Sequence, residues 1–359
     1  MGECCSVMGF SLSSSFLNDI PKEAKVFIYG AGKIGMEVFR MINRDRRDVE
    51  VLGFIDTFRS AKGILSFDDF KVLLPDCDLV VVASAKYWKD MENAVRSLGY
   101  RTIVPFLYRM ELSNEDKEKI EYVKSKIKYG SDVYENVIKS VVERNLAFIE
   151  CYYSESRFKR QYLDFIDFES VEFVIEGGVY NGRVSKKIID STCGRCVVFG
   201  FEIWGDRFLE DSLRDDNRLK LFEKALWDKR GYVYFYSDYI KFVPDGAFVV
   251  EEQDELLASG GVVSVVEAVS IDEFVAECND CKRVDYIKLD VEGAEEKVIN
   301  GAKKVIRVFR PQMAISVYHE FSHYYEIPIS ILNEVSDYIL CFEHYGKGFS
   351  DSVLYFIRE

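Results

Sequence analysis

Residues 171–190 read VEFVIEGGVYNGRVSKKIID, and this stretch decides the fold of the second half of the chain. An apolar run that ends in Glu176 enters the turn EGGVYNG (176–182), and a segment with helical spacing follows. A strand, a tight turn and a helix in this order form one unit of a parallel α/β sheet. Glycines let backbone N–H groups approach a ligand closely, and a helix N-terminus favours negative charge. We therefore expect a ligand-binding turn at the carboxyl end of this strand.

A second acidic residue strengthens this interpretation. Glu202 ends the next apolar run, VVFGFE (197–202). An acid at the end of that strand can accept hydrogen bonds from the hydroxyls of a ribose. The pattern predicts an adenosine-type cofactor site made of Glu202 and the turn residues Glu176, Gly177, Gly178, Tyr180, Asn181 and Gly182. The alternative is a glycine turn that serves close packing, beside a solvated glutamate.

A third apolar run brings more acids to the same edge of the sheet. Residues 286–296 read YIKLDVEGAEE, so a short strand is followed by Asp290, Glu292, Glu295 and Glu296. Glu295 and Glu296 fit the first turn of a helix, where acids are favoured. Lys288 alternates with Asp290, so both side chains point to one face of the strand. A lysine in a central parallel strand needs an anionic partner, which the sequence does not identify.

The first part of the chain predicts a separate, small Rossmann-like domain over residues 21–110. Apolar runs at 25–29, 49–56, 78–85 and 102–106 alternate with helical stretches, which indicates a parallel sheet. Its turn GAGKIG fits the GxGxxG pattern of dinucleotide sites. The candidate nucleotide-binding residues are Gly30, Gly32, Lys33, Gly35 and Asp56.

The function of that domain stays open among three readings. GAGKIG and GFID (53–56) resemble the nucleotide-sugar-binding domain at the front of bacterial sugar acetyltransferases. The three readings are therefore a docking site for a nucleotide sugar or glycan carrier, an NAD site, and a purely structural module. No set of dehydrogenase catalytic residues accompanies the fingerprint.

Two further segments complete the expected organisation. Residues 1–20 are serine-containing and predict a flexible leader. Residues 111–165 predict a helical connector, because SNEDKEKIEYVKSKI opens with Ser113 and early acids and no strand pattern is evident. The βα alternation then restarts over residues 166–359.

Composition excludes some classes of function. The chain has 359 residues, a formal net charge of -14 and a pI of about 5.0, whereas nucleic-acid binding needs a basic surface. No apolar run is long enough for a membrane span, and no secretory signal is visible. We therefore expect a cytoplasmic protein with no nucleic-acid partner, and the sequence leaves its oligomeric state undetermined.

Two CxxC pairs stand outside these motifs. Cys193 and Cys196 form one pair, and Cys278 and Cys281 form the other. Each pair comes just before a predicted strand, so a structural zinc site with four thiolates is one hypothesis. Loop cysteines without a ligand are the alternative.

Several ordered motifs together resemble the FkbM family of S-adenosylmethionine (SAM)-dependent methyltransferases. They are VDYIKLDVEGAEEKVINGAKKVI (284–306), RPQMAISVYHE (310–320), EIP (326–328) and SVLYFI (352–357). EGGVYNG fills the family's first cofactor motif, with Glu176 where Asp is usual, and FGFE fills its ribose motif. The resemblance covers roughly residues 160–359. It implies a class I α/β domain, a seven-stranded Rossmann-like sheet with one reversed strand, which the final hairpin supplies.

The resemblance also implies a chemistry for the third acidic run. Asp290 would lie beside the methionine end of SAM, and Asp290 and Glu292 would tolerate the positive charge of its sulfonium group. His319 ends the next strand and is the first choice as general base or substrate contact, with Asp290 as the alternative base. A hydrogen-bonded strand-end histidine is the competing reading of His319. Asp290 and Glu292 could also supply two ligands to Mg²⁺, although no third ligand is identifiable.

The function implied by the resemblance is methylation, most simply O-methylation of a saccharide in a surface glycan, a glycolipid or a nucleotide-sugar conjugate. Three rivals are an N-methyltransferase, an NAD-dependent oxidoreductase that uses the first domain, and a catalytically silent scaffold. The acceptor cannot be read from the sequence.

Overall fold

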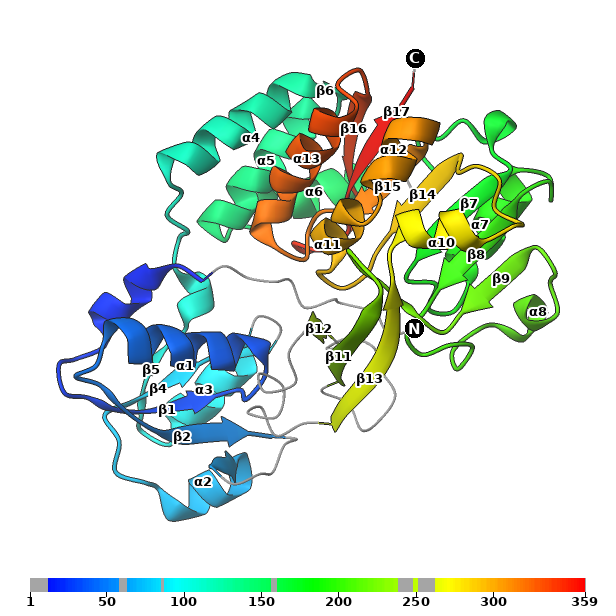
Figure 1. The fold of residues 1–359 in the computed structure, drawn as a ribbon. Coiled ribbons are helices and arrows are strands. Elements are labelled where there is room, and N and C mark those ends of the chain that lie inside the picture. The colour runs from blue at the N-terminus through cyan, green and yellow to red at the C-terminus, as the bar shows by residue number, and fades with distance from the viewer. Residues whose placement is uncertain are drawn as a thin grey trace.

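The computed structural model describes residues 12–57, 63–84, 87–155, 160–237, 248–250 and 262–358. Figure 1 shows two α/β units, a smaller one built from the N-terminal part of the chain and a larger one built from the rest. Within the described residues, no helix combines the length and the apolar character that crossing a membrane requires.

The N-terminal unit is a five-stranded parallel sheet with the order β3-β2-β1-β4-β5. Strand β4 (Leu79–Val82) is completely buried, as an apolar LVVV run in a central strand requires. The Rossmann-like expectation for this part is confirmed, and Ile64–Ser66 adds a strand that the sequence pattern did not predict. The remaining elements are β1 (Lys25–Tyr29), β2 (Glu50–Asp56), β3 (Ile64–Ser66), β5 (Arg101–Ile103), α1 (Lys33–Asp45), α2 (Phe67–Leu73) and α3 (Trp88–Ser97).

Part of the predicted flexible leader is structured instead. Ser14–Asp19 forms a 3-10 helix (η1) that the side chain of Ser13 caps. Phe16 and Leu17 are buried, and Arg46 of the loop after α1 donates a hydrogen bond to the carbonyl oxygen of Ile20. The serine-rich composition concealed an apolar set that packs on the first domain. Residues 1–11 lie outside the described part of the chain.

The predicted helical connector contains a strand. Ser113 caps α4 (Asn114–Lys126) in a capping box with Asp116, as its position before the early acids indicated. The three-residue β6 (Ile127–Tyr129) then pairs with β16 at the edge of the main sheet. The prediction of a purely helical connector is therefore wrong, because so short a strand has no visible alternation. The other elements here are η2 (Pro105–Leu107), α5 (Ser131–Glu143) and α6 (Ala147–Glu155).

The large unit has an eight-stranded sheet with the order β6-β16-β17-β15-β14-β7-β8-β9. Strand β17 runs antiparallel to both of its neighbours, so the final hairpin supplies the reversed strand of the expected seven, and β6 adds the eighth. The strands are β7 (Phe173–Gly177), β8 (Val197–Phe201), β9 (Leu219–Phe222), β14 (Tyr286–Leu289), β15 (Gln312–Ser316), β16 (Ile339–His344) and β17 (Ser352–Ile357). The helices are η3 (Phe168–Ser170), α7 (Arg183–Ser191), α8 (Asp211–Arg214), α10 (Ile271–Glu277), α11 (Glu295–Asn300), α12 (Lys303–Phe309), η4 (Phe321–Tyr324) and α13 (Glu326–Glu334).

A second, smaller sheet accompanies the main one. In it, β11 (Gly231–Ser237) pairs antiparallel with β13 (Val262–Val269), while β9 pairs with β8 in the main sheet. In β11, Val233 is buried and Tyr232 is 70% exposed. This alternation suits a sheet with one solvated face, whereas the main strands are covered on both faces. The other strands of this sheet are β10 (Ala225–Leu226) and β12 (Phe248–Val250).

The two faces of the main sheet carry separate hydrophobic clusters. Ile175 and Phe199 belong to one cluster, while Val174 and Val198 belong to the other. Since β7, β8, β14 and β15 are parallel, their carboxyl ends meet at one edge. That edge holds the candidate site.

Candidate functional site

The turn after β7 lies directly against the end of β14. Gly178 has a φ of +76°, and a Cβ at this position would lie 1.9 Å from the carbonyl oxygen of Asp290. Only glycine allows this backbone conformation and this close approach. The turn residues and Asp290, which are far apart in the sequence, are thereby brought together.

Glu202 is fixed beside the same turn. Its carboxylate, at the end of β8, accepts a hydrogen bond from the backbone N–H of Tyr180 (2.8 Å) and another from that of Trp204 (3.1 Å). Burial raises the pKa of Glu202, and the backbone donors oppose that shift. The structure thus joins the glycine turn and the strand-end acid as the sequence predicted. Their role in binding a cofactor stays a prediction.

Two turn residues differ in their surroundings. The ring of Tyr180 is 39% exposed and packs at a tilt against Phe208, whose ring also meets Trp204 edge-on. The side chain of Asn181 accepts a hydrogen bond from the backbone N–H of Arg183 and so helps to begin α7. Aromatic side chains therefore lie close to Glu202, whereas the side chain of Asn181 stabilises the turn where α7 begins.

Glu176 and Lys288 form a buried pair beneath the turn. Glu176 is fully buried and accepts a hydrogen bond from Ser185 Oγ (2.6 Å), and its other oxygen lies 3.7 Å from Lys288 Nζ. Lys288 also donates to the carbonyl oxygens of Gly177 and Gly178. Burial raises the pKa of Glu176, and the charge of Lys288 opposes that shift. Glu176 is the anionic partner that Lys288 requires, and the pair supports the turn from inside.

Asp290 stands at the end of β14 between two tyrosine hydroxyls. Tyr162 Oη donates to its Oδ2 (2.9 Å), and Tyr318 Oη donates to its Oδ1 (3.1 Å). Both tyrosines are buried. Sequence reasoning missed them, because Tyr162 lies outside the recognised motifs and Tyr318 reads as the last apolar residue before His319.

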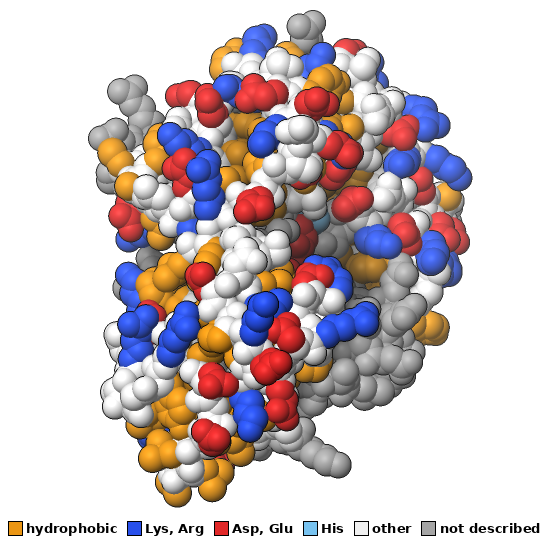
Figure 2. Space-filling view, turned by 90° about the vertical axis from the view of Figure 1, so that its left-hand side faces the viewer, with side chains coloured by type: hydrophobic (Ala, Val, Ile, Leu, Met, Phe, Trp, Pro, Cys, Tyr) orange, Lys and Arg blue, Asp and Glu red, His pale blue; other side chains and the backbone are white. Residues whose placement is uncertain are grey.

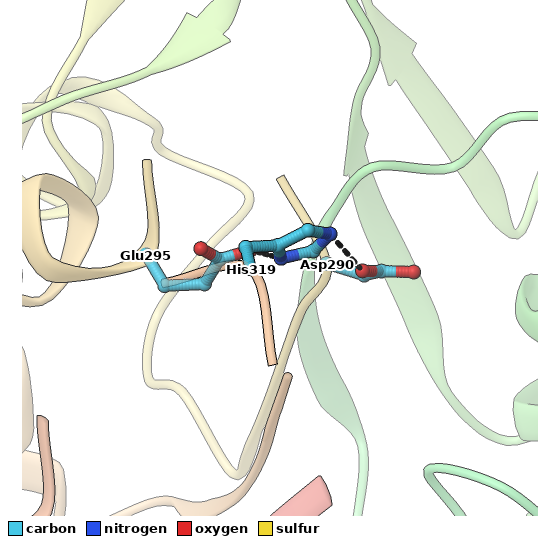
Figure 3. Close-up of side chains that lie close together, drawn as sticks. All are labelled: Asp290, Glu295 and His319. Atoms are coloured by element: carbon cyan, nitrogen blue, oxygen red, sulfur yellow. Dashed lines mark ion pairs between the residues drawn. The ribbon is translucent and has the colours of Figure 1, made fainter. Parts of the chain in front are cut away.

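His319 lies at the centre of a group of carboxylates (Figure 3). The side chain is 2% exposed. Nδ1 lies 2.9 Å from Glu295 Oε1, whereas Nε2 lies 3.4 Å from Glu292 Oε2 and 3.6 Å from Asp290 Oδ1. We name the four residues Asp290, Glu292, Glu295 and His319 the acid–histidine cluster.

Glu295 is an acid in the first turn of α11, as the sequence predicted. What the sequence did not show is that its side chain is fully buried and accepts hydrogen bonds from the backbone N–H groups of Val291 (2.8 Å) and Gly293 (3.1 Å). Burial alone would raise its pKa, but His319, His323 and the backbone donors lower it to about 2. Its neighbour Glu296 is exposed, as a first-turn acid should be.

The charge of His319 bears on its expected role as a general base. Burial alone would lower its pKa, but Glu295 and Glu292 outweigh burial and raise the pKa well above the usual value. Burial raises the pKa of Glu292, and the nearby His319 ring opposes that rise. An imidazolium cannot accept a proton, so in this state His319 holds the carboxylates in place instead.

Asp351 is a further carboxylate that the sequence analysis missed. It lies in the loop between β16 and β17, and Gln161 Nε2 donates to its Oδ1 (3.3 Å). Burial, and then the charge of Asp290, raises its pKa to about 6. The topology could have revealed it, because β16 runs parallel to β15 and its loop therefore reaches the same edge.

Comparison with known families identifies the domain. Residues 227–349 match the sequence model described as "Methyltransferase FkbM domain". The chain carries an FkbM methyltransferase domain. The matched region contains the whole acid–histidine cluster and begins after the glycine turn. Methyl transfer is therefore the reaction class of this enzyme, and the family implies SAM as the methyl donor.

The fold has a solved counterpart. The crystal structure of methyltransferase FkbM from Methylobacillus flagellatus KT aligns with a TM-score of 0.54 and 19% sequence identity, covering 96% of this chain and 92% of that one. At this identity the likeness concerns the fold, and it spans the N-terminal unit as well as the FkbM domain. None of the curated proteins matches the sequence.

The N-terminal unit that accompanies the FkbM domain assembles its own fingerprint. Asp56 Oδ2 accepts a hydrogen bond from the backbone N–H of Ala31, between Gly30 and Gly32. A Cβ on Gly35 would lie 1.8 Å from the carbonyl oxygen of Gly30, so the third glycine permits close packing of α1. Lys33 begins α1, and its side chain lies outside the described part of the structure. Nucleotide binding here stays a prediction.

The proposed four-thiolate zinc site is wrong. Cys196 is buried with Val198 on one face of the main sheet, whereas Cys281, with Cys278 packed beside it, joins the cluster on the opposite face. Cys193 is exposed. Among the described residues, the acid–histidine cluster alone brings three side chains with metal-ligating atoms together, namely Asp290, Glu295 and His319.

Proposed function

We propose that this enzyme is a SAM-dependent O-methyltransferase that modifies a hydroxyl group of a saccharide. One observation carries the proposal: the glycine turn with Glu202 and the acid–histidine cluster lie at neighbouring strand ends of one sheet edge. A cofactor bound along that edge would have its adenosine at Glu202 and its sulfonium end at Asp290.

The residues present fit SAM. Each oxygen of the Glu202 carboxylate accepts one backbone hydrogen bond, so each retains a lone pair for a ribose hydroxyl. The rings of Tyr180, Trp204 and Phe208 offer apolar surface for an adenine. When bound, SAM supplies an electrophilic methyl group on a positively charged sulfur.

The cluster divides into an open part and a buried part. The side chains of Asp290 and Glu292 are 26% and 34% exposed, whereas His319 and Glu295 are almost completely buried. We assign contact with the reacting groups to the two open carboxylates, which favour a positive charge nearby and can accept the hydroxyl proton. His319 and Glu295 keep those carboxylates in position, as in-line displacement requires.

The charge of the site supports a neutral acceptor. Three carboxylates surround the cluster's histidine, and the chain carries a net charge of -14. Anionic acceptors are disfavoured beside such a group, whereas a sugar offers neutral hydroxyls. An amine acceptor is the rival that this charge does not exclude.

Two measurements on the full chain test the proposal. Calorimetric titration with S-adenosylhomocysteine (SAH) should show one binding site per chain. Incubation with SAM and a bacterial glycan pool should then add a methyl increment to a saccharide, located on oxygen by hydrolysis and mass spectrometry. No SAH binding at millimolar concentration contradicts the cofactor assignment, and methylation of nitrogen alone contradicts the acceptor assignment.

The N-terminal unit enters the proposal as a docking site for the nucleotide or carrier part of the saccharide. The geometry that supports it is the turn with Gly30 and Asp56 at the end of adjoining parallel strands. Titration with UDP-sugars and with NAD distinguishes this reading from an NAD site. If neither ligand binds, the remaining interpretation is that the N-terminal unit is a structural module. A hydride-transfer assay tests the oxidoreductase alternative directly.

A further inference from the structure

The starting observation is a buried ring nitrogen that faces two carboxylates. His319 is 2% exposed, and its Nε2 lies 3.4 Å from Glu292 Oε2 and 3.6 Å from Asp290 Oδ1. By geometry neither ring nitrogen makes a hydrogen bond among the described residues, so Nε2 faces the two carboxylates through ion-pair contacts alone. A bound ion is one explanation for a buried polar atom without a hydrogen bond.

The other side of the ring explains its orientation. Nδ1 lies 2.9 Å from Glu295 Oε1, and the same carboxylate is held by the backbone N–H groups of Val291 and Gly293. Figure 3 shows His319 between Glu295 on one side and Asp290 on the other. Metal-ligating histidines commonly direct the second ring nitrogen at a carboxylate in this way.

The spacing suits a bound cation. Two ligand atoms that each lie about 2.1 Å from one metal ion are separated by about 3.0–3.5 Å in octahedral or tetrahedral geometry. The distance from Nε2 to Glu292 (3.4 Å) lies within that range, and the distance from Nε2 to Asp290 (3.6 Å) lies just above it. Partial exposure of Asp290 and Glu292 leaves room for entry from solvent and for ligands that the protein does not supply.

We propose that Asp290, Glu292 and Nε2 of His319 bind a divalent cation, and that Glu295 orients the histidine for it. A ligand set of one imidazole and two carboxylates favours a transition metal such as Mn²⁺ over Mg²⁺, which prefers oxygen ligands alone. The metal occupies the place of a proton on Nε2. This assignment supplies the third ligand that the sequence did not reveal.

The cation also specifies the acceptor, and this step rests on the proposed function. A divalent cation at the open end of the cluster would bind a hydroxyl oxygen and lower the pKa of that hydroxyl, so the proton would leave to solvent because Asp290 and Glu292 hold the cation. The resulting alkoxide would take the methyl group from SAM, and SAH would leave with the electron pair of the broken sulfur–carbon bond. A saccharide with two adjacent hydroxyls can occupy two coordination positions at once. We therefore expect vicinal diols to be better acceptors than isolated hydroxyls.

Titration of the chelator-treated full chain with Mn²⁺, followed by electron paramagnetic resonance, tests the site. The wild type should bind about one Mn²⁺ per chain, and its spectrum should show coupling to an imidazole nitrogen. His319→Gln and Glu292→Gln should weaken binding at least 10-fold. Glu296→Gln, the matched control on the exposed neighbouring acid, should leave it unchanged.

The nitrogen coupling is measured on the wild type, so the test stands even where a variant does not fold. Absence of Mn²⁺ binding at millimolar concentration overturns the proposal, and so does binding without nitrogen coupling or binding that both variants retain. SAH titration of the same metal-free sample distinguishes the two proposals. SAH binding without Mn²⁺ binding contradicts the cation site alone, whereas absence of both contradicts the proposed SAM-dependent function as well.

Discussion

Lys288 and Glu176 lie 3.7 Å apart, both almost completely buried, on neighbouring strands of the main sheet. Through the same ammonium group, Lys288 holds the carbonyl oxygens of Gly177 and Gly178. A charged pair inside a parallel sheet thereby fixes the turn at which the cofactor is proposed to bind. Its presence explains why a strand with otherwise apolar residues contains a lysine.

Replacement of Lys288 by Met should destabilise the protein by about 3–5 kcal/mol, because it leaves a buried carboxylate without its partner. Urea unfolding measures the change. Combining Lys288→Met with Glu176→Gln should recover part of the loss, since the uncompensated charge is then removed. Lys186→Met, which breaks an exposed pair with Asp190, is the control and should cost less than about 1 kcal/mol. A double variant as unstable as the sum of its single variants would contradict the pairing.

Replacement of Glu202 by Gln should weaken SAH binding about 10- to 100-fold, because charge-assisted hydrogen bonds to ribose hydroxyls are lost. Calorimetry measures the affinity, and the unfolding curve of the variant shows whether the turn is intact. Glu210→Gln is the control, since Glu210 pairs with Arg183 at the surface and lies outside the proposed contact. Equal affinities of the Glu202 variant and the wild type would remove the ribose assignment.

The sequence predicted the frame of this site well because the frame depends on local patterns. Apolar runs that end in Glu176, Glu202 and Asp290 mark three parallel strands, and parallel strands deliver their ends to one edge. The glycine turn and Asp290 therefore met as expected. What the pattern could not show was which way each acid faces. Glu176 turned inward to Lys288, because a residue inside a strand points to one face or the other according to register.

Two contacts of the site could not be predicted, for a different reason. Glu295 is a first-turn acid of α11, as the local pattern indicates, but its contact with His319 comes from the end of another strand. Tyr162 reaches Asp290 from a segment before the first strand of the domain. Long-range contacts of this kind leave no periodic signal in a single sequence.

Replacement of Tyr162 by Phe should lower kcat/KM for methyl transfer about 10-fold, because Asp290 loses a buried hydroxyl donor that holds its carboxylate in place. Steady-state kinetics with SAM and the identified saccharide measures the effect. The fold should be retained, since the ring still packs in its place. Tyr122→Phe, at an exposed position on α4, should leave kcat/KM unchanged. A Tyr162 variant with wild-type kinetics would show that Asp290 needs no such support.

His344 predicts a pH dependence of stability that is separate from the active site. Its ring is fully buried, Nδ1 lies 2.8 Å from Ser352 Oγ, and Nε2 lies 2.9 Å from the carbonyl oxygen of Gly348. Tyr324 Oη donates to the same Ser352 Oγ, so the serine hydroxyl is free to donate to Nδ1 while Nε2–H donates to the carbonyl. The neutral ring therefore satisfies every partner, and burial lowers its pKa to about 4.

The sign of the effect follows from that shift. Between an unfolded pKa of about 6.5 and the folded value, the unfolded chain binds more protons, so the free energy of unfolding falls as the pH falls. His344 should therefore contribute a loss of about 3 kcal/mol between pH 7 and pH 4. His344→Gln removes this contribution, while His319 and His323 titrate in both proteins. Urea unfolding across that pH range should show the stability advantage of the wild type shrinking as the pH falls. A constant difference would mean that the pKa of His344 is the same in the folded and unfolded chains.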